Sequence, residues 1–203
     1  MILSAVQIQK ELDSEDEGSF FIAPRLLTEL TNEQKGTASI DLRLGSWFVA
    51  PKSNQIPCLD IVNPANEISE EALTSRKFMA IGANYILHPG NFVLAATLEW
   101  ISMPNRLCGY VTGKSSWGRR GLVIETAPGV HPGFSGCLTL EVANVGEVPI
   151  SLTVGMAICQ LFLHRLDEPV QVPSDSLFAG SRKPKLGKIR ADPLVDAWKR
   201  HRI

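Results

Sequence analysis

The sequence lacks a hydrophobic run long enough to cross a bilayer, and its N-terminus lacks the basic and apolar segments of a signal peptide. It also lacks an excess of charge of either sign, because its formal net charge at pH 7 is -1. A nearly neutral chain has no general attraction to nucleic acids or to anionic membranes. We therefore expect a cytoplasmic protein that binds neither.

Cysteine is scarce in this chain. The four cysteines, Cys58, Cys108, Cys137 and Cys159, are scattered without the paired spacing of a metal site or a redox motif. Three of them lie in apolar runs that read as strands. The pattern indicates buried, reduced thiols and predicts no metal site.

The composition of the chain is that of a folded domain rich in short strands. Its 203 residues are 44% hydrophobic and 20% charged, close to globular averages. From Ile40 onward, apolar or alternating runs are separated by Pro-Gly turns, which favours an all-β sandwich or barrel. Ser4 and Gln7 match a capping box before a short N-terminal helix, and residues 68–78 are predicted to form a second helical segment. The clearest predicted strands are 92–101, 107–112, 137–144, 148–153 and 158–164.

Two neighbouring segments carry the residues best suited to chemistry. Residues 113–122 read GKSSWGRRGL, and residues 131–141 read HPGFSGCLTLE. They combine hydroxyls, guanidinium groups, a Pro-Gly turn and one acid, a mixture that a stable core does not need. Leu138, Leu140 and Val142 alternate as one strand face, so Glu141 lies on the opposite face with Thr139. That face is only partly polar, which indicates a lined pocket.

These segments resemble the dCTP deaminases of the trimeric dUTPase-like superfamily, whose pattern is approximately G-R-S-S-x-x-R-x-G-L followed by T-A and D-P-G-W-S-G-x-x-x-L-E. The likeness extends to IDLRLG at residues 40–45, HPG at 88–90 and GMAICQL at 155–161. It covers residues 1–166 in one register. The resemblance implies a nucleotide-binding domain over 1–166, folded as a distorted β-barrel of the dUTPase type, and a basic C-terminal tail over 167–203.

The same resemblance implies an enzyme that hydrolyses dCTP to dUTP and ammonia, which supplies precursor for dTMP synthesis. It also implies a homotrimer whose sites lie between subunits. The common zinc deaminases carry an H-x-E and P-C-x-x-C signature. This chain has neither, so the expected route is independent of zinc and needs a carboxylate beside a trapped water.

By resemblance, the catalytic residues are Glu141, Ser115, Arg119 and Ala127. Glu141 is the proton shuttle, and the Ser115 hydroxyl anchors the water or the exocyclic amine. Arg119, chosen over its neighbour Arg120 by its spacing from Ser115, orients the glutamate and steadies charge on the ring. The backbone carbonyl of Ala127 holds the water.

The expected substrate-binding residues surround this set. Lys114 and Ser116 follow a glycine whose backbone can approach an anion closely, and Gln160 matches a family position that contacts phosphate. Magnesium is expected to arrive on the triphosphate. The remaining expected contacts are His131, Phe134, Thr139 and, from the basic tail, Lys185.

The chain departs from the family at three places. His131 replaces the aspartate that activates water in the dUTP-cleaving relatives and holds the sugar 3'-hydroxyl in the deaminases. Phe134 replaces a tryptophan, and the tail around Gly187 has basic residues in place of the tyrosine and Q-x-G element that close over the nucleotide. The basic tail is either a phosphate clamp and lid or a solvated segment.

These departures leave alternatives open. One is a non-catalytic nucleotide-binding or regulatory homologue, and another is a deaminase for a different pyrimidine nucleotide. The loss of the aspartate disfavours dUTP diphosphatase activity.

Overall fold

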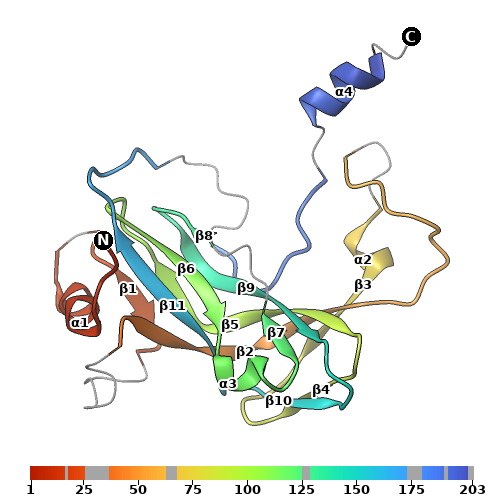
Figure 1. The fold of residues 1–203 in the computed structure, drawn as a ribbon, viewed down its shortest axis with the longest axis horizontal. Helices are drawn as coiled ribbons and strands as arrows, with labels where there is room; N and C mark the ends of the chain where they lie inside the picture. Colours follow the sequence, from red (N-terminus) through yellow and green to blue (C-terminus); the bar gives the residue numbers. More distant parts are fainter. Residues whose placement is uncertain are drawn as a thin grey trace.

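Antiparallel strands form one curled sheet that dominates the molecule (Figure 1). The computed structural model describes residues 1–16, 18–25, 37–62, 68–124, 129–172, 180–189 and 192–200. The strands of the large sheet are β1 (Phe21–Ala23), β2 (Ser39–Pro51), β3 (Thr74–Phe78), β5 (Phe92–Ser102), β6 (Leu107–Gly113), β7 (Leu122–Ile124), β8 (Gly129–Val130), β9 (Ser135–Asn144) and β11 (Ala157–Arg165).

The main path of this sheet runs β7–β9–β5–β2–β11–β6–β8, with β1 beside β5 and β3 beside β2. A separate two-stranded sheet pairs β4 (Asn84–Leu87) with β10 (Ile150–Thr153). The large sheet curls into part of a barrel, as Figure 1 shows. The predicted mainly β fold of distorted-barrel type is confirmed.

The core lies on the inner side of this curl because the long strands alternate. On β9 every second residue from Gly136 to Asn144 is buried. Leu42, Leu44 and Phe48 of β2 are likewise 0% exposed. Each fully buried side chain of this size contributes about 1.5–3 kcal/mol to stability. The alternate side chains point away from this core and are therefore available to line a binding site.

The predicted N-terminal helix is confirmed as α1 (Ala5–Asp13). Its capping box is complete: the Gln7 amide donates to Ser4 Oγ at 3.4 Å, and the Ser4 amide donates to Gln7 Oε1 at 2.9 Å. The buried Glu11 carboxylate accepts from Arg106 and Arg165 at 2.7 and 2.6 Å. These bonds fix α1 to the sheet.

The predicted helical segment 68–78 is wrong over most of its length. Only α2 (Glu70–Leu73) is helical, and Thr74–Phe78 forms β3. The Thr74 hydroxyl donates to the Glu70 carbonyl at 2.7 Å, and the next residues pair with β2 from Pro51 back to Trp47. Pairing with a strand distant in sequence outweighs local helix preference here.

The expectation of buried thiols holds fully only for Cys159, because Cys108 and Cys137 are half-buried and Cys58 is exposed. None of the four cysteines is in a disulfide. Burial raises the pKa of Cys159 to about 12, and the carboxylates of Glu99 and Asp41 act in the same direction. The Cys159 thiol is therefore protonated and inert at neutral pH.

The C-terminal tail lies partly against the sheet. The Gly180 amide donates to the Ser135 carbonyl at 2.6 Å, and the Cys137 amide donates to the Ser181 carbonyl at 2.9 Å. The last helix, α4 (Pro193–Arg200), extends away from the sheet (Figure 1). Within the described ranges, every helix is too short or too polar to cross a bilayer.

Candidate active site

Strand β9 places Glu141 on the face that the alternation predicts. Leu138, Leu140 and Val142 are buried, while Thr139 and Glu141 are half-buried on the opposite face. The strand pairs with β5 so that Leu94 lies directly across from Glu141. Glu141 is thus held by a regular ladder beside an apolar neighbour.

A pocket of about 700 Å³ opens over this face of β9. Of the residues predicted from the sequence, it brings together Glu141, Thr139, His131, Phe134 and Lys185. Among the lining residues that the structure describes, Glu141 is the only carboxylate, and most of the others are apolar. The remaining lining residues are Phe92, Leu94, Gly129, Val130, Pro132, Gly133, Cys137, Leu138, Val170, Val172 and Leu186.

The His131–Phe134 turn forms one wall of the pocket. The Phe134 amide donates to the His131 carbonyl at 3.1 Å, and Gly133 and Phe134 each bond to the Met103 backbone at 2.9 and 2.7 Å. Gly133 has a φ of 75°, a region that favours glycine, and Val172 of the tail packs closely against it. A side chain at this position would collide with Val172.

We therefore expect Gly133→Ala to lower the free energy of unfolding by about 3 kcal/mol, from backbone strain plus the collision. Gly90→Ala is the matched control, because Gly90 also follows a proline, has a φ of 71° and has open space around it. It should lose only about 1 kcal/mol. Urea unfolding of both variants measures the difference, and equal losses would contradict the role given to Val172.

Ser115, Ser116 and Arg119 lie on the short helix α3 (Ser115–Gly118) and at its end. The turn is anchored to β11, because Trp117 Nε1 donates to the Ala157 carbonyl at 2.9 Å. All three predicted residues are exposed. None of them lines the Glu141 pocket, among the residues that the structure describes.

The structure also distinguishes Arg119 from Arg120. The Arg120 guanidinium donates to the Ser116 carbonyl at 2.6 Å and so stabilises the turn. Within the described part of the chain, no hydrogen bond or ion pair holds the Arg119 guanidinium. Arg119 is therefore the arginine available to a ligand.

Lys114 and Gln160 meet at a residue that the sequence analysis did not select. Lys114 Nζ forms an ion pair with Asp41 Oδ2 at 2.5 Å, and Gln160 Nε2 donates to Asp41 Oδ1 at 3.1 Å. Gln160 and Asp41 are register partners on β11 and β2. Residues 40–44 alternate, so Asp41 lies on the face opposite the buried Leu42. This alternation is the sequence pattern from which Asp41 could have been identified.

A second missed residue is Glu99, which is 3% exposed on β5. Burial raises the pKa of its carboxyl, while the Arg43 amide, which donates to Glu99 Oε2 at 2.9 Å, acts to lower it. Nearby, the Thr97 hydroxyl donates to the Glu99 carbonyl at 2.8 Å and accepts from the Leu138 amide at 2.9 Å. This network fixes the β5–β9 contact behind the pocket.

The predicted residues thus divide into two groups in one chain. One surrounds Glu141 in the pocket, and the other comprises Lys114, Ser115, Ser116, Arg119 and Gln160 near α3. Ala127 lies outside the described residues. No cluster of three or more His, Cys, Asp or Glu side chains that could hold a metal ion occurs within the described ranges.

The fold is thus a curled antiparallel sheet with a partly apolar, carboxylate-bearing pocket on its strands. The sequence model of the dCTP deaminase-like family matches residues 2–166. The chain belongs to the dCTP deaminase-like family.

Individual relatives agree with this assignment. The dUMP-forming dCTP deaminase of Corynebacterium efficiens is 38% identical over 183 residues, which are 90% of this chain and 88% of the relative. The dCTP deaminase of Natronomonas pharaonis is 35% identical over 197 residues, covering 95% and 96%. The crystal structure of 2'-deoxycytidine 5'-triphosphate deaminase from Agrobacterium tumefaciens has the same fold, with a TM-score of 0.56 at 20% identity, covering 80% of this chain and 46% of that one.

Proposed function

We propose that this protein catalyses the zinc-independent hydrolytic deamination of dCTP to dUTP and ammonia. The observation that carries the proposal is the position of Glu141, which is the only carboxylate among the described residues that line a partly apolar pocket. A carboxylate beside a stacked ring and a trapped water is what a metal-free deamination requires. Membership of the dCTP deaminase-like family supports the choice of ring and nucleotide.

In this mechanism, the oxygen of a water molecule forms a bond to C4 of the cytosine ring. Glu141 takes the proton that the water loses and passes it to the exocyclic amine. The C4–N bond then breaks and ammonia leaves, and the C4 oxygen becomes the carbonyl of uracil as its second proton moves to N3 of the ring. Ser115 holds the water or the amine, Arg119 stabilises charge on the ring, and the Ala127 carbonyl orients the water.

Residues of both groups recognise the sugar and phosphates. Phe134 and Thr139 line the space beside Glu141, and His131, which is exposed at the pocket, accepts the hydrogen bond of the 3'-hydroxyl when neutral. Lys114, Ser116, Gln160 and Lys185 face the triphosphate, which arrives with Mg²⁺ as part of the substrate. Release of Lys114 and Gln160 from Asp41 then accompanies phosphate binding.

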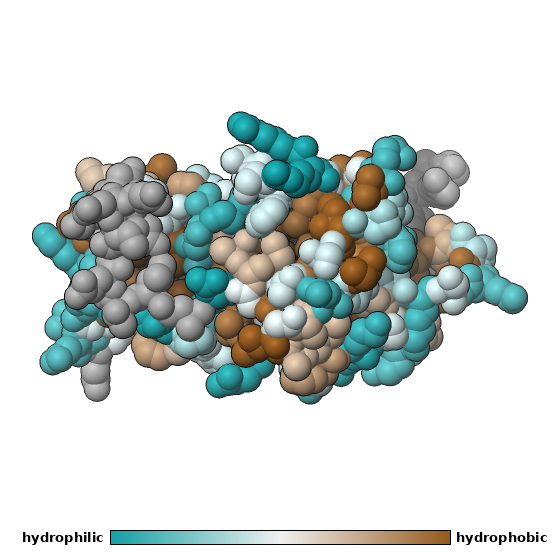
Figure 2. Space-filling view, turned by 90° about the horizontal axis from the view of Figure 1, so that it is seen from below, coloured by the Kyte–Doolittle hydropathy of each residue, from teal (hydrophilic) through white to brown (hydrophobic). Residues whose placement is uncertain are grey.

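The active form in this proposal is a homotrimer in which Ser115 and Arg119 of one subunit complete the Glu141 pocket of the next. The separation of the two residue groups within one chain supports it. So does exposed apolar surface, since Val145 and Val148 are 68% and 71% exposed. Figure 2 shows apolar surface left uncovered among hydrophilic residues on one face of the molecule.

The nucleotide product distinguishes a deaminase that releases dUTP from one that goes on to form dUMP. Relatives include both dUMP-forming and simple dCTP deaminases. Cleavage of dUTP needs a base beside the phosphates, and position 131 carries histidine where that carboxylate would stand. We therefore expect purified protein with dCTP and magnesium to release dUTP and ammonia, and to leave added dUTP intact.

Chromatography of the nucleotides after incubation with dCTP and, separately, with dUTP measures this. Release of dUMP and pyrophosphate from dCTP would show that the protein catalyses the dUMP-forming reaction and that dUTP is not the final product. Tight dCTP binding without any product would instead favour a regulatory homologue. Turnover of another pyrimidine nucleotide in preference to dCTP would change the substrate.

A further inference from the structure

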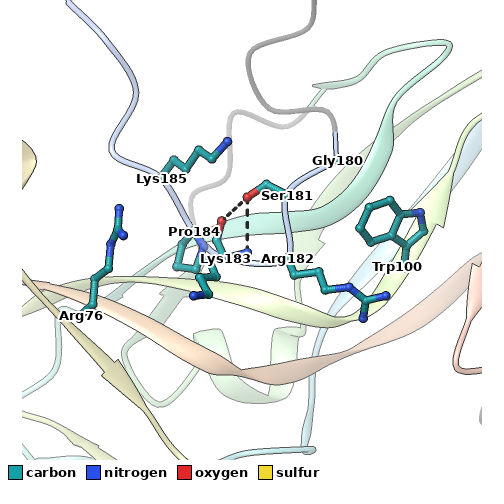
Figure 3. A pocket seen from close by; sticks show the side chains of 8 residues that line it. All are labelled: Arg76, Trp100, Gly180, Ser181, Arg182, Lys183, Pro184 and Lys185. Carbon is teal, nitrogen blue, oxygen red and sulfur yellow. Dashed lines mark hydrogen bonds between the residues drawn. The ribbon is translucent and has the colours of Figure 1, made fainter.

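A second, cationic hollow lies where the C-terminal tail crosses the sheet. It has a volume of about 460 Å³ and is lined by Arg76 of β3, Trp100 of β5 and the tail residues 180–185 (Figure 3). Of the eight described residues that line it, four are Lys or Arg and none is acidic. We refer to it as the tail pocket. Among the residues that the structure describes, only Lys185 lines both this pocket and the Glu141 pocket.

The tail is held in place at this position by its own backbone. Besides the bonds of Gly180 and Ser181 to β9, the Ser181 hydroxyl donates to the Lys183 carbonyl at 2.7 Å. Pro184 is buried at the end of this turn. The turn thus presents its basic side chains from a fixed backbone.

Two aromatic rings position the cations of the turn. The Arg182 guanidinium carbon lies 5.2 Å from the centroid of the Trp100 ring. Lys183 Nζ lies 4.1 Å from the centroid of the Trp47 ring. Contacts of this kind orient a cation without neutralising its charge. These side chains are therefore partly ordered before a ligand binds, which lowers the entropy lost on binding.

The cations stand on different sides of the hollow. Figure 3 shows Arg76 and Lys185 on one side and Arg182 beside Trp100 on the other. Arg76 carries one partial counter-charge, because its Nη2 is 3.0 Å from Glu70 Oε1. Several separated cations, with one competing carboxylate among the described residues, suit an anion that has more than one charged group.

We propose that the tail pocket binds an oligophosphate anion, either free pyrophosphate or the terminal phosphates of a nucleotide. Because Lys185 lines both pockets and Leu186 lines the Glu141 pocket, an anion held here also fixes the tail over that pocket. The nucleotide source rests on the proposed function, whereas the binding of free pyrophosphate does not.

Titration of the full chain with sodium pyrophosphate at low salt, followed by calorimetry and by tryptophan fluorescence, tests the proposal. We expect saturable binding that Arg76→Gln and Arg182→Gln each weaken by about tenfold. Glu70→Gln should tighten it severalfold, because Arg76 loses its competing carboxylate. Lys77→Gln is the matched control, since Lys77 neighbours Arg76 on β3 but lies by the Tyr85 ring, 5.7 Å from its centroid.

Unsaturable binding to the wild-type chain, or equal affinity in wild type, Arg76→Gln and Arg182→Gln, would overturn the proposal. Repeating the titration with dCTP present identifies the source of the anion. Unchanged pyrophosphate affinity assigns the pocket to a free anion, and competition assigns it to nucleotide phosphates. Arg76-dependent pyrophosphate binding by a protein that does not deaminate dCTP would uphold the tail pocket and reject the proposed function.

Discussion

Glu141→Gln is expected to lower kcat for dCTP deamination by about a thousandfold while dCTP still binds. Glutamine has the shape of glutamate but cannot accept the proton that the attacking water must lose. The side chain lies in a half-buried position on β9, so the substitution should leave the ladder and the pocket walls in place. Chemistry is therefore lost with little change in folding.

Single-turnover kinetics and calorimetric titration with dCTP separate these two effects. Glu71→Gln is the control, because Glu71 is an exposed residue on α2, outside both groups of predicted site residues, and should behave as wild type. Near wild-type turnover in Glu141→Gln would remove the carboxylate from the mechanism. Loss of dCTP binding with an intact fold would make Glu141 a binding residue instead.

Mixing two inactive variants is expected to restore activity if the site is shared between subunits. Arg119→Gln should be as inactive as Glu141→Gln, because each removes one part of every site. In a trimer that contains both variants, about one third of the sites (one of the three) combine a wild-type Glu141 from one chain with a wild-type Arg119 from the next. Co-expression with two affinity tags and tandem purification would give the mixed oligomers, whose kcat per site is then measured.

Arg120→Gln provides the control for this experiment. Its guanidinium bonds to the Ser116 carbonyl, so its loss should affect the stability of the turn and leave most of the turnover intact. Mixed oligomers that remain as inactive as the single variants would show that one chain supplies both groups. Purification of the wild-type chain as an active monomer would contradict the shared site as well.

The strands and the position of the acid could be predicted because both depend on local alternation. Side chains on a strand point alternately to its two faces, so Leu138, Leu140 and Val142 determine where Glu141 lies. The structure confirms that arrangement, and a pocket lies on the face where the sequence predicts one. The capping box of α1 was equally local, since Ser4 and Gln7 interact within one turn.

Local alternation does not predict the strand at residues 74–78 or the contacts of Asp41. Residues 74–78 become a strand only because β2 lies beside them, and a partner distant in sequence leaves no local signal. Asp41 is one polar residue in an alternating strand, and its role depends on β6 and β11 bringing Lys114 and Gln160 to it. Pairing across the sheet supplied both features.

The sequence by itself determined the mainly β fold, the face on which Glu141 stands and the membership of the dCTP deaminase-like family, because alternation and motif spacing are written along the chain. Only the tertiary structure decided that Lys185 reaches the Glu141 pocket and that Arg76 meets the tail. Those contacts join segments far apart in sequence. Their free energy comes from burial and pairing, which exist only once the sheet has curled and the tail has docked.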